Sequence, residues 1–188
     1  MTWPSTSLQE TLNIDHPIIQ APMGGTVSPA LTAAIANSGG LGMIAGISAT
    51  PDKLRTAIQQ TNSLTHRPFG VNLVFKDDVA PLVDVALEEQ VKVFSFFWGD
   101  PKPFSETIHQ TGGLVMHTVS SVDEAKRSLD SETDIIAHRP DGLGIERYTS
   151  APLTNRSPGK SKPSRCGPAK PCTASRKPNL PQRSFVNS

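Results

Sequence analysis

Short apolar runs alternate with helix-period segments over the first 138 residues of the chain. The apolar runs show no clean inside and outside alternation, which is typical of strands covered on both faces. They lie at Ile18–Ala21, Leu41–Ala45, Phe69–Leu73, Val93–Phe97, Leu114–His117 and Asp134–Ala137. The helical patterns between them lie at about Pro29–Asn37, Pro51–Gln60, Ala80–Glu89, Pro103–Gln110 and Val122–Leu129. Six strands alternating with five helices predict right-handed βαβ units and a parallel sheet.

Two glycine clusters flank the predicted helix at Pro29–Asn37. A dinucleotide fingerprint places G-x-G-x-x-G after a strand, where it opens a helix. Gly39, Gly40 and Gly42 instead follow a predicted helix, so we interpret them as a helix C-cap and a tight turn. Gly24 and Gly25 do lie between a strand and a helix. That end of a parallel sheet is where ligands bind.

The last fifty residues differ in composition from the rest. Residues 1–138 carry 8 Lys and Arg against 15 Asp and Glu, whereas residues 139–188 carry 10 against 2. Eight of the 17 prolines fall in the same fifty residues, and apolar periodicity ends there. Such a segment cannot bury enough apolar surface to offset its ordering entropy. We therefore predict a disordered, basic, Pro/Ser-rich tail over residues 146–188, after a domain over residues 1–145.

Targeting and metal signals are weak. The first residues lack a basic segment followed by an apolar core, and no run of eighteen apolar residues occurs, so we expect a cytoplasmic protein without a membrane span. Cys166 and Cys172 match neither a zinc pair nor a redox motif. The five histidines are scattered, and none has an acidic or cysteine partner at ligand spacing, so we expect no metal site.

Several motifs in order resemble the nitronate monooxygenase family, formerly called 2-nitropropane dioxygenases. They are PIIQAPMGG, NSGGLGMIAG, PFGVNL, VFSFFWGDP and SSVDEA, within about Pro17 to Ala137. APM and GGLG also resemble inosine monophosphate dehydrogenase barrels and FMN-dependent enoyl-acyl-carrier reductases, whereas GVNL and SFFWGDP favour the nitronate enzymes. The resemblance implies FMN as cofactor and an α/β fold of the (β/α)8 TIM-barrel type, here truncated after about six βα units.

The same resemblance implies a flavin site at the ends of the strands. It implies that one loop lies against the flavin, formed here by Ala21, Pro22, Met23 and Gly24. Asn72, near the end of the third predicted strand, is expected to hydrogen-bond the flavin. Glycine permits close approach of the backbone, and a neutral polar side chain suits a flavin edge. The alternative is that Met23 belongs to the core and Asn72 caps a strand.

The resemblance ends after the sixth predicted strand. The family has a pattern like A-Q-G-x-E-A-G-G-H there, in which Gln and Gly hold the flavin and His is the catalytic base. This chain reads AHRPDGLGI, which places His138 at the Gln position and Ile145 at the His position. His138 is therefore our expected flavin contact on this strand. Isoleucine cannot accept a proton, so no catalytic base is identified.

Two other groups of residues have open interpretations. His117 and Thr118 are predicted to end the fifth strand, where a histidine either faces the flavin phosphate or substrate or lies on the surface. Phe94, Phe96, Phe97 and Trp98 either line an apolar substrate pocket or fill the core.

The sequence thus supports two classes of function. The first is FMN-dependent oxidation of nitronates or nitroalkanes with O₂ to a carbonyl compound and nitrite, at less than a family-like rate. The second is a non-catalytic fragment, such as a frameshifted or misspliced product, whose basic tail binds polyanions through charge alone. The low aromatic content of the tail argues against nucleic acid as a partner. Oligomeric state and the particular substrate are not indicated.

Overall fold

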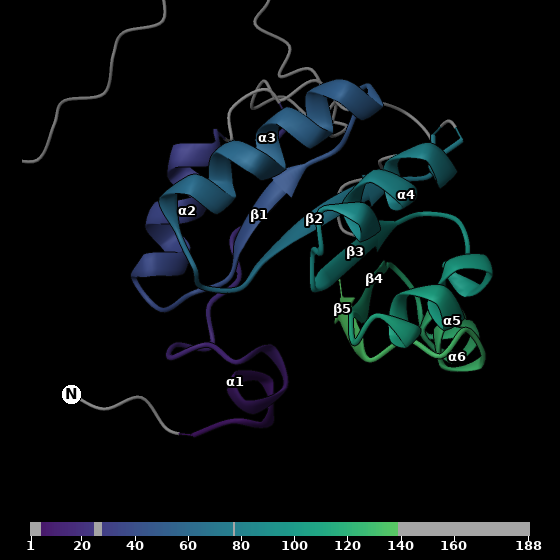
Figure 1. Cartoon of the computed structure of the whole chain (residues 1–188). Helices are drawn as coiled ribbons and strands as arrows, with labels where there is room; N and C mark the ends of the chain where they lie inside the picture. Colours follow the sequence, from purple (N-terminus) through teal and green to yellow (C-terminus); the bar gives the residue numbers. More distant parts are fainter. Residues whose placement is uncertain (1–4, 25–27, 77, 139–188) are drawn as a thin grey trace, which may run out of the picture. The chain divides into compact units, whose positions relative to one another are not determined.

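The computed structural model describes residues 5–24, 28–76 and 78–138, all within one compact unit, Met1–Ser157. Five parallel strands, in the sheet order β1-β2-β3-β4-β5, form its centre (Figure 1). They are β1 Gly42–Ala45, β2 Phe69–Val74, β3 Val93–Phe97, β4 Leu114–Val119 and β5 Ile135–His138. The helices are α1 Ser7–Leu12, α2 Pro29–Asn37, α3 Pro51–Leu64, α4 Ala80–Glu88, α5 Lys102–Gln110 and α6 Val122–Asp130.

Sequential strand order identifies the fold type. Each strand is hydrogen-bonded in parallel to the strands that precede and follow it in the chain, with a helix in every connection. A doubly wound sheet would reverse its strand order at a switch point, and this sheet does not. The arrangement is that of consecutive units of a (β/α)8 barrel, which confirms the predicted α/β fold.

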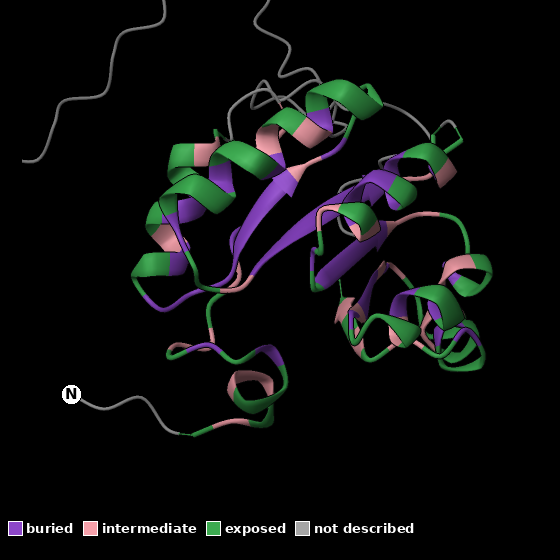
Figure 2. Cartoon of the chain, viewed as in Figure 1, coloured by how far each residue is buried: buried purple, intermediate pink, exposed green. Residues whose placement is uncertain are grey.

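The two faces of the sheet pack against different partners. One face meets α3, α4 and α5, and its buried side chains include Phe94 and Phe96. The opposite face carries a smaller apolar cluster with Met43, Val93 and Met116, to which α1 adds Leu12. Figure 2 shows most of the strand residues buried, with exposed residues concentrated on the outer sides of the helices. The second face corresponds to the interior of a barrel.

Local sequence signals explain the helix boundaries. The side chains of Ser28, Thr50 and Ser121 each accept a hydrogen bond from a backbone N–H in the first turn of the following helix. Gly39 has a φ of +88° just after α2, which confirms the predicted glycine turn. Helix α1 was not predicted, although Thr6 and Gln9 form a capping box at its start.

The first predicted strand is wrong in extent. Within Ile18–Ala21 only Ile19 pairs with the sheet, through an isolated parallel bridge to Leu41. The chain then leaves the ladder, and the backbone N–H of Met43 donates to Oε1 of Gln20 at 3.2 Å, a side-chain bond in place of a ladder bond.

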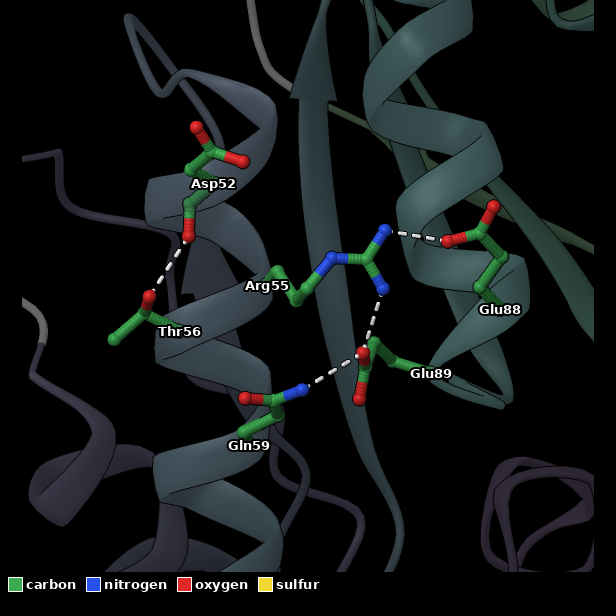
Figure 3. A network of polar contacts seen from close by, with 6 residues as sticks. All are labelled: Asp52, Arg55, Thr56, Gln59, Glu88 and Glu89. Atoms are coloured by element: carbon green, nitrogen blue, oxygen red, sulfur yellow. Dashed lines mark hydrogen bonds and ion pairs between the residues drawn. The ribbon is translucent and has the colours of Figure 1, made fainter.

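Helices α3 and α4 are joined on their outer surface by Arg55. Its guanidinium contacts the carboxylates of Glu88 and Glu89, and the distance to Oε1 of Glu89 is 2.8 Å (Figure 3). Gln59 donates to the same Glu89 oxygen at 3.0 Å. The hydrogen bonds to Glu88 and Glu89 raise the pKa of Arg55 above its usual value. Arg55 and Glu89 are half-buried and Glu88 and Gln59 are exposed, so the network links two helices near the surface.

Candidate functional site

Asn72 and the loop at Ala21–Gly24 lie at the same edge of the sheet. Asn72 is opposite Ala45, the last residue of β1, and opposite Ser95 of β3. A Cβ at Gly24 would lie 2.4 Å from Cγ2 of Ile47, so the loop packs directly on the segment that follows β1. The backbone N–H of Gly46, in that segment, donates to the Asn72 carbonyl oxygen at 2.8 Å. The structure therefore brings Gly24 and Asn72 together at the carboxyl end of the strands.

The loop presents exposed side chains at this edge. Ala21, Pro22 and Met23 are exposed, and Met23 retains 38% of its surface. This excludes the alternative in which Met23 belongs to the core. An exposed methionine and a buried asparagine at the same edge of the sheet offer both an apolar contact and a hydrogen-bonding group, the combination that organic cofactors use.

The Asn72 side chain lies on the face of the sheet opposite Phe94 and Phe96. Val71 of β2 is opposite Phe94 of β3, and Asn72 is opposite Ser95. Because successive side chains of a strand point to opposite faces, Asn72 and Ser95 lie on the barrel-interior face. Asn72 is 4% exposed, and its Nδ2 donates to Oγ of Ser95 at 3.1 Å and to the Ser95 carbonyl oxygen at 3.3 Å. Asn72 is thus held by β3 and is more than a strand-end cap.

His138 is not brought onto the same face as Asn72. It is the last residue of β5 and pairs with Val119 of β4. Val119 lies two residues after His117 and therefore on the same face, and the His117 side chain faces helix α6. The His138 side chain thus also starts from the helix-facing side. His138 thus shares the carboxyl end of the sheet with Asn72 but not its face. The positions of Arg139 to Ile145, including the expected base position, lie outside the described residues.

His117 is buried, which excludes the alternative in which it lies on the surface at the end of its strand. β4 continues for two more residues to Val119, and His117 is 6% exposed. Its Nδ1 is 2.7 Å from Oγ of Ser128, whose hydroxyl donates to the Glu124 carbonyl oxygen. This contact holds the His117 ring against α6, on the helix-facing side of the sheet.

A polar cavity of about 250 Å³ lies beside His117, on the helix-facing side. It is lined by Gly99, Asp100, His117, Glu124, Arg127, Ser128 and Ser131. Burial raises the pKa of Asp100, but hydrogen bonds from Ser131 and the Lys102 backbone, with the charges of His117 and Lys102, outweigh it and leave the pKa below its usual value. Because His117 and Ser128 of α6 line it, the cavity is on the opposite face of the sheet from Asn72.

The aromatic cluster is divided between two environments. Phe94 and Phe96 are fully buried, and Phe96 stacks on Phe75 and Phe104 with ring centroids 5.4 and 6.0 Å apart. Phe97 and Trp98 are half-buried and stack on each other at 4.6 Å. The core interpretation is therefore correct for the first two, whereas Phe97 is the last residue of β3 and Trp98 follows it.

Three further observations concern the described residues. A larger cavity of about 470 Å³, lined in part by Arg67 and Lys92, lies at the amino ends of β2 and β3, the end of a barrel associated with stability. Among the described residues, no group of His, Cys, Asp and Glu side chains is arranged to bind a metal ion. None of the described helices has the length and apolar character to cross a bilayer.

Comparison with known proteins gives consistent matches to the N-terminal part. Residues 5–82 match the family model described as nitronate monooxygenase. A probable nitronate monooxygenase of Staphylococcus haemolyticus is 30% identical in an alignment 193 residues long. The alignment covers 82% of this chain and 54% of the relative. A (3aS,4S,5R,7aS)-5-hydroxy-7a-methyl-1-oxo-octahydro-1H-indene-4-carboxyl-CoA dehydrogenase of Rhodococcus jostii is 34% identical over 132 residues, 70% of this chain and 37% of the relative.

A solved structure shows the same fold. FabK from Thermotoga maritima superimposes with a TM-score of 0.68 at 33% identity, over 71% of this chain and 43% of that chain. The chain thus spans between about a third and a little over half of the length of these relatives. Because relatives with different named activities share the segment, the segment alone does not select a substrate.

Proposed function

The N-terminal part of this chain belongs to the nitronate monooxygenase family, and on that premise we propose that its carboxyl sheet edge binds FMN. The observation that carries the proposal is the convergence of Gly24, Met23 and Asn72 at one edge, built from two distant chain segments. The resemblance to the family implies the same residues independently of their positions.

The side chains at this edge fit a flavin. Gly24 has no side chain, and a Cβ there would meet Ile47; a bare backbone at this point also suits close approach to a planar ring. Met23 provides an exposed apolar contact, and Asn72 provides a neutral hydrogen-bonding group. When bound, FMN would supply the electron transfer from a nitronate to O₂ that yields a carbonyl compound and nitrite.

The protein residues have binding and orienting roles in this proposal. Asn72 would fix the flavin edge, and the loop at Ala21–Gly24 would exclude water from one side of the ring. No described residue is assigned as the catalytic base, and Ile145 stands at the family's base position. We therefore propose an FMN-binding segment with the oxidoreductase chemistry of its family, and a nitronate turnover well below that of the family.

FMN titration of the full chain, followed by quenching of flavin fluorescence, tests the proposal. We expect saturable binding that Asn72→Ala weakens roughly tenfold, because one buried hydrogen bond is lost. Asn62→Ala is the matched control, since Asn62 is exposed on α3 and lines the cavity at the opposite end of the strands. Absence of saturable binding, or equal weakening by both substitutions, would contradict the proposal.

A further inference from the structure

Ser95 is a polar residue inside a strand that is otherwise apolar. It lies between Phe94 and Phe96 in β3, is 2% exposed, and shares the barrel-interior face with Asn72. A buried hydroxyl costs free energy unless it forms hydrogen bonds. The partner that the structure gives to Ser95 is the amide of Asn72, through both the hydroxyl and the carbonyl oxygen.

These two contacts determine the orientation of the Asn72 amide. Amide oxygen and nitrogen are otherwise hard to distinguish, and their assignment depends on the hydrogen-bond partners. A backbone carbonyl can only accept, so the atom 3.3 Å from the Ser95 carbonyl oxygen must be Nδ2. The hydroxyl contact at 3.1 Å goes to the same nitrogen. The donor side of the amide is therefore directed at Ser95.

The remaining polar atom of Asn72 is its oxygen. Oδ1 has no protein donor among the described residues and is not fully sealed from solvent. Asn72 consequently offers a neutral acceptor at the ligand edge and no donor. A carboxylate or phosphate oxygen placed against Oδ1 would meet lone pairs, whereas an N–H or O–H group would complete a hydrogen bond.

We propose that Ser95 is a positioning residue which fixes the Asn72 amide so that Oδ1 accepts a hydrogen bond from the flavin. The donor is either the ring N3–H or a ribityl hydroxyl. This inference rests on the proposed FMN site, and it assigns to Ser95 a role in ligand recognition without any contact to the ligand. Sequence reasoning missed Ser95, because a single serine in an apolar strand gives no motif.

FMN affinity of the full chain, compared between variants, tests the recognition step. We expect Ser95→Ala to weaken FMN binding roughly tenfold, since the amide then keeps only its longer contact, 3.3 Å to the backbone carbonyl oxygen of residue 95, and is held less firmly. Ser95→Thr keeps the hydroxyl and should retain most of the affinity. Ser105→Ala is the matched control, because Ser105 is equally buried but bonds only Pro101 and Ser131 carbonyl oxygens on the helix side.

Flavin analogues identify the donor. If the donor is the ring N3–H, Ser95→Ala and the unsubstituted chain should bind N3-methyl-FMN equally. If it is a ribityl hydroxyl, the equality should appear with an FMN analogue deoxygenated in the ribityl chain. Persistence of the tenfold difference with both analogues would overturn the proposed acceptor role of Oδ1.

Side-chain amide NMR of the ligand-free chain separates this inference from the proposed function. The Asn72 Nδ2 hydrogens should exchange slowly with solvent, and Ser95→Ala but not Ser105→Ala should reduce the protection, because only the contact to the backbone carbonyl oxygen then remains. Unchanged exchange in Ser95→Ala would overturn the positioning role whether or not FMN binds. Protected Asn72 hydrogens without FMN binding would contradict the flavin assignment and leave the positioning role supported.

Discussion

Individual side chains at the carboxyl edge of the sheet are arranged by contacts that the sequence shows only in part. Family resemblance predicted Asn72 and the loop at Ala21–Gly24, and the structure places them together. Ser95 and the burial of His117 could not be predicted. The face on which Ser95 lies depends on the exact register of β3, and the burial of His117 depends on β4 extending two residues beyond it. Apolar periodicity does not fix strand register or strand ends to within one or two residues.

The fit of the loop against Ile47 gives a prediction for Gly24→Ala. The added Cβ would meet Cγ2 of Ile47, an exposed side chain that can move, so we expect little change in the thermal midpoint. The displaced loop should nonetheless bind FMN less tightly. Ile47→Ala in the same chain removes the obstructing atom and should restore affinity. A Gly24→Ala variant that binds FMN normally would show that the loop does not contact the ring.

Asp100 gives a prediction for stability at low pH. Its pKa is lowered in the folded chain, so the ionised carboxylate contributes stability that is present above the unfolded pKa of about 3.9. That contribution is lost as pH falls through the folded pKa. We expect Asp100→Asn to lower the urea midpoint at neutral pH and to differ less from the unsubstituted chain below about pH 4. A difference that does not depend on pH would contradict the role of the charge.

Elements were predicted more accurately than single side chains. The five helices and the strands after Ile18–Ala21 were located from apolar periodicity and end signals, because parallel strands and their helices bury long apolar runs. The first strand was overestimated, since the side chain of Gln20 replaces a ladder bond. Helix α1 is too short for periodicity to reveal, and only its capping box marks it.

Helix α6 and strand β5 expose apolar side chains at one side of the sheet. Val122 and Leu129 of α6 are 71% and 66% exposed, and Ile136 of β5 is 36% exposed. We expect Leu129→Lys to reduce self-association, measured by light scattering, without lowering the thermal midpoint. The control is Ile108→Ala, which removes a fully buried side chain and should cost about 2–5 kcal/mol of stability. A large loss of stability in Leu129→Lys would show that Leu129 is packed in solution.

At the scale of the molecule, the fold was predictable and the activity was not. The order of βα units follows from local patterns, whereas catalysis needs a base, which the resemblance to the family implies would follow the sixth predicted strand, the β5 of the structure. Residues 139–188 lie outside the described structure, so the predictions of a disordered tail and of domain boundaries at residues 145 and 146 stay predictions.

The sequence at that base position gives a prediction for turnover. With saturating FMN, we expect the full chain to release nitrite from a nitronate about 10²–10⁴-fold more slowly than a full-length nitronate monooxygenase, because Ile145 cannot act as a general base. Nitrite release with time, corrected for free FMN, measures this. Comparable rates would show that another residue performs the proton transfer.

Amide hydrogen exchange of the full chain with and without FMN tests the central claim most directly, since it locates the bound ligand on the fold. The account predicts slower exchange in residues 21–24, 45–48 and 72–75 at the carboxyl ends of the strands. Residues 65–68 and 90–92, around the cavity at the amino ends, should not change. Protection confined to the amino ends, or no protection at saturating FMN, would contradict the account.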